Sequence, residues 1–509
     1  MRVTPLLRYN VFDEKNIYRK EITLMAIVSL LEALVKGILE AEEKFFQDPK
    51  DFYGLETSVK HAAETFSAEF LSEVLSSMNQ QIYKNMWRKE RYSAQRTDKR
   101  TIISSVGDVT FDCTYYRRRK DKSYHYLLEE MINLDKHERL TEAAEVALLT
   151  EALKTSYEEA TKVLPSKQKI TKSTVYDKVH GIAEEIPLEI PAEKKVCAYL
   201  HIEADEDHVA EQHGRWNPKE NNASFITKLI YLYEQKHEVS DVKGRKELVG
   251  TFYFSGVYGG SDGVERFWNQ VREYIEASYD TESIRQIYIS GDGASWIKSG
   301  VKYLEKSLFC ADKFHLMKYI NTAAGQMLDE KEAVKEELWH RLYSQKRDAK
   351  KRFDKYTRDM LASANNEKVI EDLRNYVLGN WAAVRRTLRD KNVNGCSAES
   401  HVSHMLSDRL SSRPMGWSQT GADRMSKLRC YEKNYGREKI IDLVKYSREK
   451  RKLLRTGTED IPVKELTLRE VTAEHYDQAK SYIDRIQATI PGMTAKKSAS
   501  IRTQLWLMQ

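Results

Sequence analysis

The sequence predicts a multidomain α+β protein in which helical regions surround one α/β domain. Apolar residues recur at helical spacing in the first 100 residues and again in residues 321–395, while residues 194–320 alternate short β-branched runs with amphipathic helices. The length of 509 residues exceeds what one ordinary core accommodates. We therefore expect several domains, one of which carries a sheet.

Composition and charge favour a globular protein that contacts a polyanion. Hydrophobic residues make up 41% and aromatic residues 10% of the chain, which excludes a disordered class. The net charge of +6 hides basic clusters at residues 84–100, 117–122 and 445–455. Any one cluster is typical of a solvated surface, but several together favour nucleic acid as a partner.

Cysteine usage and hydropathy favour a cytoplasmic protein. The five cysteines are widely spaced and never form a CxxC pair, which excludes a zinc finger by spacing and fits a reducing compartment. The most apolar stretch, residues 22–34, is interrupted by Glu32 and is too short to span a bilayer. It also lacks the flanks of a signal peptide, so we expect no membrane partner.

Residues 1–100 and 101–185 are expected to form two successive regions. The first is helical, and we interpret it as a packing or dimerisation region. The second begins with a β-branched, aromatic run at residues 101–116, which Gly107-Asp108 breaks into a hairpin. A small structural sheet is nearly as good an interpretation as a hairpin that lies on phosphates. The residues predicted to contact DNA here are Arg117, Arg118 and Arg119.

Three helices are expected after the hairpin, at residues 140–153, 156–165 and 171–184. A buried stripe of Val175, Val179 and Ile182 in the third helix leaves its polar side chains facing outward. A polar helix after a turn is the plan of a major-groove reader, although a small helical bundle shares this pattern. The residues predicted to bind DNA from this helix are Lys172, Tyr176 and Lys178.

A predicted catalytic domain, residues 194–435, follows a linker at residues 185–195 that contains two prolines. A helical insertion at residues 321–395 interrupts it, and residues 436–509 are expected to form a basic helical C-terminal region. The domain has the order β-β-β-α-β-α-β-α, which is that of the ribonuclease H fold. Its elements are expected at residues 196–204, 225–233, 248–257, 262–278, 284–289, 295–306, 308–311 and 313–324.

Asp205 and Asp292 are candidate ligands for the two divalent cations that phosphodiester chemistry requires. Asp205 lies where the first strand ends, and Asp292 stands in a Gly-Asp-Gly turn after the fourth strand. These strands are neighbours in the ribonuclease H topology, so the two carboxylates should meet. Glu203 and Asp207 alternate onto the same face as Asp205, so the choice among these three acids stays open.

Further candidates follow the fifth strand and the insertion. Asp312 and His315, like Asp207, are expected to hold the metal ligands in place or to contact DNA. We prefer this interpretation to a zinc site that would include Cys310. Glu399, on the first turn of a helix, is the candidate third acid. Arginines after it would hold phosphates, and a tryptophan would stack on an unpaired base or anchor its own loop. These residues are Arg409, Arg413 and Trp417.

The candidate residues fall in motifs that together resemble the ISLre-type insertion-sequence transposases, a bacterial family also classed as uncharacterised. The likeness covers most of the chain, from about residue 90 to about residue 435. The matching segments are Glu203-Ala-Asp-Glu-Asp-His-Val209, Ser290-Gly-Asp-Gly-Ala-Ser-Trp-Ile297, Asp312-Lys-Phe-His315, Ser397-Ala-Glu399 through Trp417-Ser418, and the end of the hairpin, Tyr115-Tyr-Arg-Arg118.

This resemblance implies a DDE transposase with a helical insertion before the final Glu. Asp205, Asp292 and Glu399 would then be the catalytic triad and would hold two Mg²⁺ ions, with Mn²⁺ as a substitute. The resemblance also implies binding to the terminal inverted repeats of double-stranded DNA, strand cleavage and strand transfer. A homodimer or higher homo-oligomer would form when two ends are synapsed, and the bound protein would lie at the nucleoid.

One departure from the wider group concerns a basic residue that some integrase-like relatives place seven positions after the Glu. Leu406 stands at that position here, and Arg409 is the nearest substitute. Two other functions remain as alternatives. A ribonuclease-H-like, structure-specific nuclease would use the same triad on branched DNA without strand transfer. A domesticated DNA-binding protein that no longer cuts is disfavoured, because acids stand at all three positions.

Overall fold

The structure is a computed structural model that describes residues 14–135, 137–212, 223–238, 246–327, 330–413 and 415–455. Contacts between Cα atoms divide the described chain into two compact units. The first extends to Ala144 and includes Leu164–Lys169, and the second comprises Glu145–Val163 and Ile170–Arg455. Most of the predicted C-terminal region, from residue 456 onward, lies outside the described residues.

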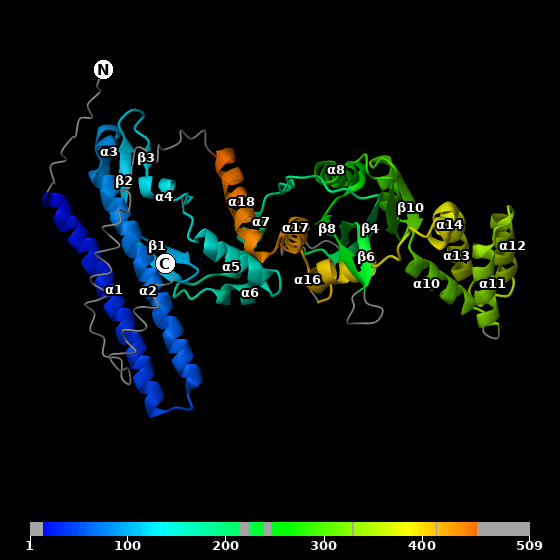
Figure 1. Ribbon diagram of the computed structural model, residues 1–509, viewed down its shortest axis with the longest axis horizontal. Coiled ribbons are helices and arrows are strands. Elements are labelled where there is room, and N and C mark those ends of the chain that lie inside the picture. The colour runs from blue at the N-terminus through cyan, green and yellow to red at the C-terminus, as the bar shows by residue number, and fades with distance from the viewer. Residues whose placement is uncertain are drawn as a thin grey trace, which may run out of the picture. The chain divides into compact units, whose positions relative to one another are not determined.

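The first unit pairs a long helical hairpin with a small antiparallel sheet. Helices α1 (Glu14–Gln47) and α2 (Phe52–Lys84) lie side by side (Figure 1). The order of the sheet is β1 (Tyr92–Ser104), β2 (Gly107–Arg118) and β3 (Tyr124–His125). The hairpin predicted at residues 101–116 is therefore present, but its first strand begins nine residues earlier, within the basic cluster of residues 84–100.

Helix α2 is fixed on β2 by one side chain, Asn79, which both donates a hydrogen bond to Thr114 and accepts one from it. Asn79 is buried, and its amide nitrogen donates to Thr114 Oγ1 at 3.1 Å. The amide oxygen of Asn79 accepts from the backbone N–H of Thr114 at 3.0 Å. Because both polar groups of Asn79 are paired, the interface between helix and sheet carries no desolvation penalty at this position.

The helices after the sheet are shorter than the sequence pattern predicts. They are α4 (Leu127–Met131), α5 (Glu142–Ala152), α6 (Tyr157–Ala160) and α7 (Lys172–His180). Another short helix, α3 (Met86–Arg91), precedes β1. Ser156 accepts from the N–H of Glu159 at 3.1 Å, as its capping pattern predicts, but α6 makes one turn and continues as a 3₁₀ turn. Helix α7 ends at His180 instead of residue 184, with Gly181 as its C-cap.

The second unit is built on a mixed five-stranded sheet in the order β10-β9-β4-β5-β8. Strand β4 pairs antiparallel with β5 and parallel with β9. At the two edges of the sheet, β8 pairs antiparallel with β5, and β10 pairs parallel with β9. The bounds are β4 (Tyr199–Ala210), β5 (Ser224–Tyr233), β8 (Phe252–Gly256), β9 (Gln286–Gly291) and β10 (Ser307–Ala311).

One predicted strand, at residues 248–257, is divided in two. Gly250 has a φ of +68°, a backbone conformation that L side chains rarely adopt, and the chain turns there. The residues before it form β7 (Lys246–Val249), which pairs with β6 (Gln235–Glu238) in a separate two-stranded sheet. The predicted helix at residues 295–306 is likewise shorter, with α9 (Ser295–Lys298) followed by a 3₁₀ turn.

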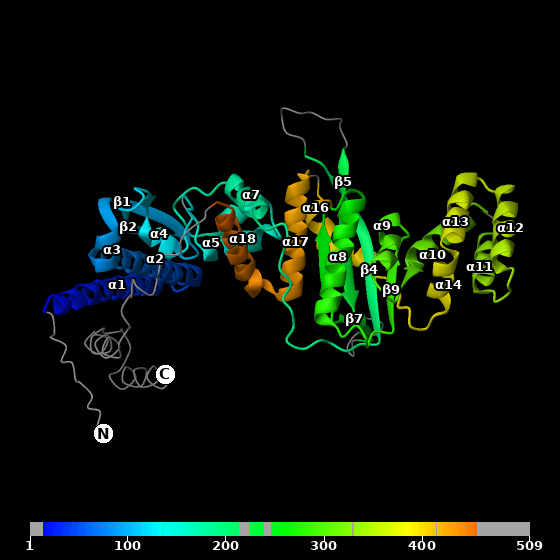
Figure 2. The ribbon, with the colours of Figure 1, turned by 90° about the horizontal axis from the view of Figure 1, so that it is seen from above.

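The two faces of the sheet have different surroundings. Leu200, Ile202 and Ala204 of β4 pack against α8 (Gly260–Ser278), which lies along the sheet in Figure 2. The alternate residues of β4 face the segment formed by α15 (Ala398–Val402), a π-helical turn (Ser403–Ser407) and α16 (Asp408–Leu410). The polar candidates of β4 therefore share the face opposite α8.

Helix α17 (Gln419–Tyr435) covers the edge of the sheet at β8. The amide of Asn434 accepts from the backbone N–H of Tyr253 and donates to its carbonyl oxygen, both at 2.8 Å. Asp423 accepts from the N–H of Val257 at 3.0 Å. These side chains satisfy backbone groups that an edge strand would otherwise offer to another chain.

The predicted helical insertion has a core of its own, in which Phe353, Leu373 and Val377 are fully buried. Thr387 Oγ1 donates to the carbonyl oxygen of Ala311 at 2.7 Å, which attaches the insertion to β10. The helices are α10 (Lys313–Ala324), α11 (Lys331–Tyr343), α12 (Ala349–Leu361), α13 (Glu367–Gly379) and α14 (Trp381–Arg389).

A buried ion cluster joins three helices of the second unit. Glu145 of α5 accepts from Arg448 of α18 (Ile440–Arg455) at 2.5 Å and from Lys178 of α7 at 3.2 Å. Val175 and Val179 are buried as predicted, but Lys178 is buried beside them and does not face outward. The ion pair with Glu145 explains the difference, because a paired lysine can enter a helix interface. No helix in the described ranges has the length and hydropathy to cross a membrane.

Replacing Arg448 by Met tests this cluster. The change would leave Glu145 buried with less compensation, and breaking a buried pair in this way costs about 3 kcal/mol or more. We expect the free energy of unfolding, measured by urea denaturation, to fall by that amount. The matched change Lys439→Met, at an exposed ion pair of the same end of the chain, should have a much smaller effect. Equal effects of the two changes would contradict the assignment.

Candidate active site

Asp205 lies within β4 and Asp292 follows β9, and the two strands pair directly. The sequence places Asp205 where the first strand ends, but β4 continues to Ala210 because its antiparallel pairing with β5 extends that far. Glu203 of β4 is level with Ser290 of β9 in the parallel register, and each Asp lies two residues further along its own strand. The charge of Asp292 raises the pKa of Asp205, after burial as the larger cause, which places the two carboxylates within electrostatic reach. The structure thus brings together two of the three acids that the sequence singles out.

Glycines on both sides of Asp292 permit this approach. A Cβ atom on Gly291 would lie 2.8 Å from the carbonyl oxygen of Ala204, so no larger residue fits there. Gly293 has a φ of +100°, which turns the chain away from the sheet. Asp292 Oδ1 accepts from the N–H of Ala294 at 2.8 Å, and this bond holds the carboxylate inside the turn.

Asp312 extends the same line of acids to β10. Its N–H donates to the carbonyl oxygen of Gly291 at 2.9 Å, which sets Asp312 beside the Gly-Asp-Gly turn. As the N-cap of α10, Asp312 accepts from the N–H groups of Phe314 at 2.9 Å and His315 at 3.4 Å. Its carboxylate also holds His315 Nδ1 at 2.6 Å. We call Asp205, Asp292 and Asp312, with His315, the acidic row.

The acidic row carries three carboxylates and one imidazole. Burial raises the pKa of Asp205 to about 6, and the charge of Asp292 contributes to the rise. The hydrogen bond to Asp312 raises the pKa of His315 above its ordinary 6.5, and the charges of the three carboxylates act in the same direction. The row therefore attracts cations, and a divalent cation would stabilise the ionised form of Asp205.

Glu203 is the acid whose carboxylate is already taken up by protein groups. Tyr233 OH donates to it at 2.7 Å, Tyr231 OH also donates, and the N–H of Ser397 donates at 2.6 Å. Burial raises the pKa of Glu203, but the charge of Lys236 and these hydrogen bonds together bring it below its ordinary value. In the sequence, the only sign of this network is the alternation of Tyr231 and Tyr233 in β5, which no motif contains.

Glu399 lies on α15, whose first turn is tied to β4 through the bond between Ser397 and Glu203. Further along, Asp207 accepts from Ser411 Oγ at 3.0 Å, so the segment runs along the face of β4 that carries Asp205. Glu399 itself is exposed. In the described part of the chain, no three His, Cys, Asp or Glu side chains lie close enough to hold a metal ion together. The structure does not bring Glu399 into the acidic row.

Arg409 and Trp417 are both buried in this conformation. Arg409 Nε donates to the carbonyl oxygen of Ala152 at 2.9 Å, and its guanidinium lies 4.7 Å from the centre of the Trp417 ring. Neither side chain is open to DNA, so their observed role is packing, the alternative that the sequence left for Trp417. Arg413 is exposed. Contact of these residues with DNA stays a prediction.

The basic candidates divide into exposed and engaged side chains. Arg117, Arg119 and Lys172 are exposed. Arg118 forms an ion pair with Asp121 at 3.2 Å. Tyr176 is 43% exposed and its ring stacks on that of His180, with the centroids 3.8 Å apart.

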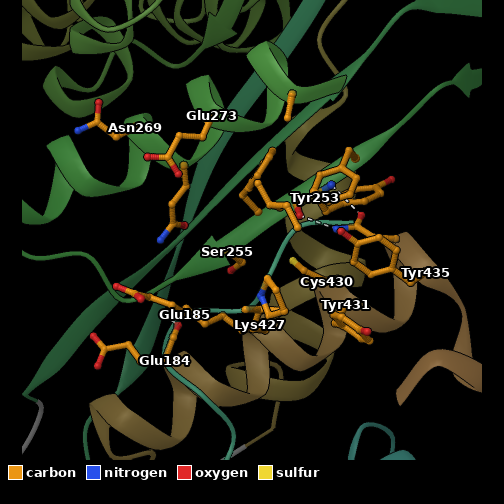
Figure 3. Close-up of a pocket in the computed structure, with 18 of the residues that line it drawn as sticks. Glu184, Glu185, Tyr253, Ser255, Asn269, Glu273, Lys427, Cys430, Tyr431 and Tyr435 are labelled. Carbon is orange, nitrogen blue, oxygen red and sulfur yellow. Dashed lines mark hydrogen bonds between the residues drawn. The ribbon is translucent and has the colours of Figure 1, made fainter. Parts of the chain in front are cut away.

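A cavity of about 720 Å³ lies between the linker, β8, α8 and α17 (Figure 3). Figure 3 shows Asn269 and Glu273 of α8 on one side and Tyr431 and Tyr435 of α17 on the other. No member of the acidic row lines this cavity. Its lining mixes aromatic residues with acidic and amide side chains, and it is separate from the candidate active site.

The fold and the site define a mixed α+β protein with carboxylates just beyond the parallel pairing of two adjacent strands. The chain belongs to the uncharacterised protein family UPF0236, whose model matches residues 48–446.

Comparison with known proteins finds relatives in a bacterium. A UPF0236 protein of Caldanaerobacter subterraneus subsp. tengcongensis is 33% identical over 434 residues, covering 85% of this chain and 87% of its own. A second from the same organism is 32% identical over 410 residues, covering 80% and 83%. The Drosophila P element transposase strand transfer complex is 13% identical and covers 69% of this chain and 93% of its own. Its TM-score of 0.20 is too low to show a common fold.

Replacing Asp205 by Asn tests the electrostatics of the row. The folded-state pKa of about 6 exceeds the ordinary 3.8, so the native state loses stability as the pH rises from 3.8 through 6. Without metal, we expect Asp205→Asn to raise the free energy of unfolding by about 2 kcal/mol near pH 7.5 and by less near pH 4.5.

Chemical denaturation at the two pH values measures this difference. Asp359→Asn, at an exposed carboxylate on α12, makes the same charge change and should leave stability nearly unchanged at both. A lower free energy of unfolding for Asp205→Asn at pH 7.5 would contradict this prediction. It would show that interactions of the ionised Asp205 carboxylate outweigh the cost of burying it.

Proposed function

We propose that the protein is a DNA transposase of the DDE class that binds the terminal inverted repeats of its element and catalyses metal-dependent strand cleavage and strand transfer. The acidic row is the observation that carries this proposal. Asp205 of β4 and Asp292 after β9 each lie two residues beyond the last parallel pair of these strands, and α/β sheets bind ligands at the carboxyl side of their parallel strands.

The strand order supports a ribonuclease-H-like catalytic domain. If the strands of the main sheet are numbered along the chain, their order across the sheet is 5-4-1-2-3. Strands 1, 2 and 3 pair antiparallel, and strands 4 and 5 are parallel to strand 1. The helices of the insertion stand between the fifth strand and α15, where a DDE enzyme with an insertion would carry them. Fold alone does not define function, so the proposal depends on the site.

The donor set fits hard divalent cations. Carboxylate oxygens are the ligands that Mg²⁺ prefers, and the raised pKa of Asp205 reflects a burial and a neighbouring charge that a cation would offset. Asp205 and Asp292 would hold two Mg²⁺ ions, or Mn²⁺ in their place, with Glu399 as the proposed third ligand from α15. Bound there, the ions would activate the attacking oxygen and stabilise the leaving oxygen of the phosphodiester.

The residues around these ligands have separate proposed tasks. Asp312 orients the His315 ring through Nδ1, which leaves Nε2 to donate to a phosphate oxygen of DNA. Glu203 fixes the start of α15 and so the approach of Glu399. Arg117, Arg119 and Lys172 are exposed basic side chains that would neutralise phosphates.

One relative adds support of another kind. The name of the first Caldanaerobacter protein joins eleven designations from one organism, as expected of a protein encoded by many copies of a mobile element. A homodimer or higher homo-oligomer would be needed to hold two element ends together.

The first test of this function is cleavage of DNA that carries the element's own ends, in Mg²⁺ or Mn²⁺. We expect the wild type to cut at the ends, and Asp292→Asn or Glu399→Gln to lower the rate at least about 10³-fold with DNA binding intact, because each removes a ligand of the ions. Asp280→Asn is the matched control and should cut normally, because Asp280 precedes β9 and Asp292 follows the opposite end of that strand.

The products distinguish the alternatives. Joining of cut ends to target DNA supports transposition, whereas cutting of branched DNA without joining would favour a structure-specific nuclease. Binding without any cutting by the wild type would favour a DNA-binding protein without activity. Normal cutting by Asp292→Asn would remove the acidic row from the chemistry.

The proposed DNA contacts predict a salt dependence. Each phosphate contact that is lost should reduce the slope of log K against log salt by about 0.9. We expect Lys172→Ala and the double change Arg117→Ala/Arg119→Ala to weaken binding to element ends in this way, measured by fluorescence anisotropy at several salt concentrations. Lys60→Ala, at an exposed ion pair on α2, serves as the control. Unchanged slopes would place the DNA elsewhere on the protein.

A further inference from the structure

The helical insertion contributes one polar group to the surroundings of the acidic row. Tyr376 lies on α13, and a Cβ atom on Gly293 would lie 3.6 Å from its ring carbon Cε2. The ring edge therefore rests on the Gly-Asp-Gly turn. The charges of Asp312 and Asp292 both act on the hydroxyl of Tyr376, which shows that it lies within electrostatic reach of the two carboxylates.

The hydroxyl of Tyr376 is buried and has no hydrogen-bond partner among the residues that the structure describes. A buried tyrosine hydroxyl normally has one, because leaving a donor unpaired away from water is costly. Such an exception near a charged site needs a physical reason. One such reason is that the hydroxyl donates to an acceptor that becomes available when the site binds a ligand.

The ring of Tyr376 is held from two directions. It stacks on the ring of Tyr319 in α10, with centroids 4.6 Å apart and planes at 23°. The carbonyl oxygen of Tyr376 accepts from the side-chain nitrogen of Asn380 at 2.9 Å, and Asn380 accepts from Lys298 Nζ of α9 at 3.4 Å. The end of α13 is thus fastened to the segment that follows the Gly-Asp-Gly turn.

Of the two nearby carboxylates, Asp292 has more open acceptor capacity. Asp312 already accepts from Phe314 N–H, from His315 N–H and at His315 Nδ1. Asp292 accepts one bond, from the N–H of Ala294. A carboxylate has about four lone-pair sites, so Asp292 can take a bond from Tyr376 and still bind a cation.

We propose that Tyr376 is a positioning residue for Asp292, whose carboxylate accepts a hydrogen bond from the Tyr376 hydroxyl when a divalent cation is bound. This inference rests on the proposed function, since it assigns Asp292 as a metal ligand. It gives the insertion a specific task, because the partner that orients a metal-binding carboxylate is supplied by α13. Partners of this kind typically contribute 10–100-fold to metal affinity.

Mn²⁺ binding to the full chain in the absence of DNA tests the inference, with free Mn²⁺ followed by electron paramagnetic resonance. We expect Tyr376→Phe to weaken Mn²⁺ binding about tenfold and Asp292→Asn to weaken it further. Tyr319→Phe removes the hydroxyl from the stacked neighbour, keeps the ring and should bind Mn²⁺ as the wild type does. In cleavage, Tyr376→Phe should need more Mg²⁺ for half-maximal rate and recover at saturation.

The outcomes separate the two proposals. Wild-type affinity in Tyr376→Phe, with loss in Asp292→Asn, overturns the role of Tyr376 and leaves the proposed function standing. Unchanged affinity in Asp292→Asn, or no saturable binding by the wild type, overturns the metal site and the inference with it. A lower unfolding temperature of Tyr376→Phe without metal would show that the hydroxyl serves packing, and would also overturn the inference.

Discussion

Hydrogen bonds between β4 and β9 hold Glu203 level with Ser290, and this register sets the positions of Asp205 and Asp292. The two residues are separated by a meander, a helix and a turn along the chain, yet each stands two positions beyond the same rung of the sheet. Because Gly291 has no side chain, the backbone of β9 can lie close to the carbonyl oxygen of Ala204 at that point. A shift of one residue would send one carboxylate to the face covered by α8.

The face that carries these acids is organised by a buried charge. Glu203 collects hydrogen bonds from β5 and from the start of α15, and Lys236 balances it. A carboxylate buried in this way is costly unless every acceptor site is used, and here the tyrosines and Ser397 use them. The same network fixes α15 against β4, so the helix that bears Glu399 is positioned by a residue that takes no part in the proposed chemistry.

The acidic row has the opposite character. Its acids stand on neighbouring strands with His315 beside them, and burial raises the pKa of Asp205, with the charge of Asp292 as a smaller cause. Folding therefore buries Asp205 within electrostatic reach of Asp292, and a carboxylate with a pKa raised in this way is typical of functional sites more than of packing. The insertion contacts this row through the ring of Tyr376, and its attachment to β10 through Thr387 keeps that contact near the strand ends.

The sequence by itself determined the succession of strands and helices, the helical insertion and the two aspartates that meet. Such features follow from local patterns, because hydrophobic periodicity and a Gly-Asp-Gly turn can be recognised in the sequence without knowledge of tertiary contacts. Only the tertiary structure decided which polar residues are engaged. Lys178 and Glu203 look like surface or site residues in the sequence, yet each is buried against a partner far along the chain. The break at Gly250, the burial of Arg409 and the exposed position of Glu399 likewise depend on long-range packing, which no local pattern encodes.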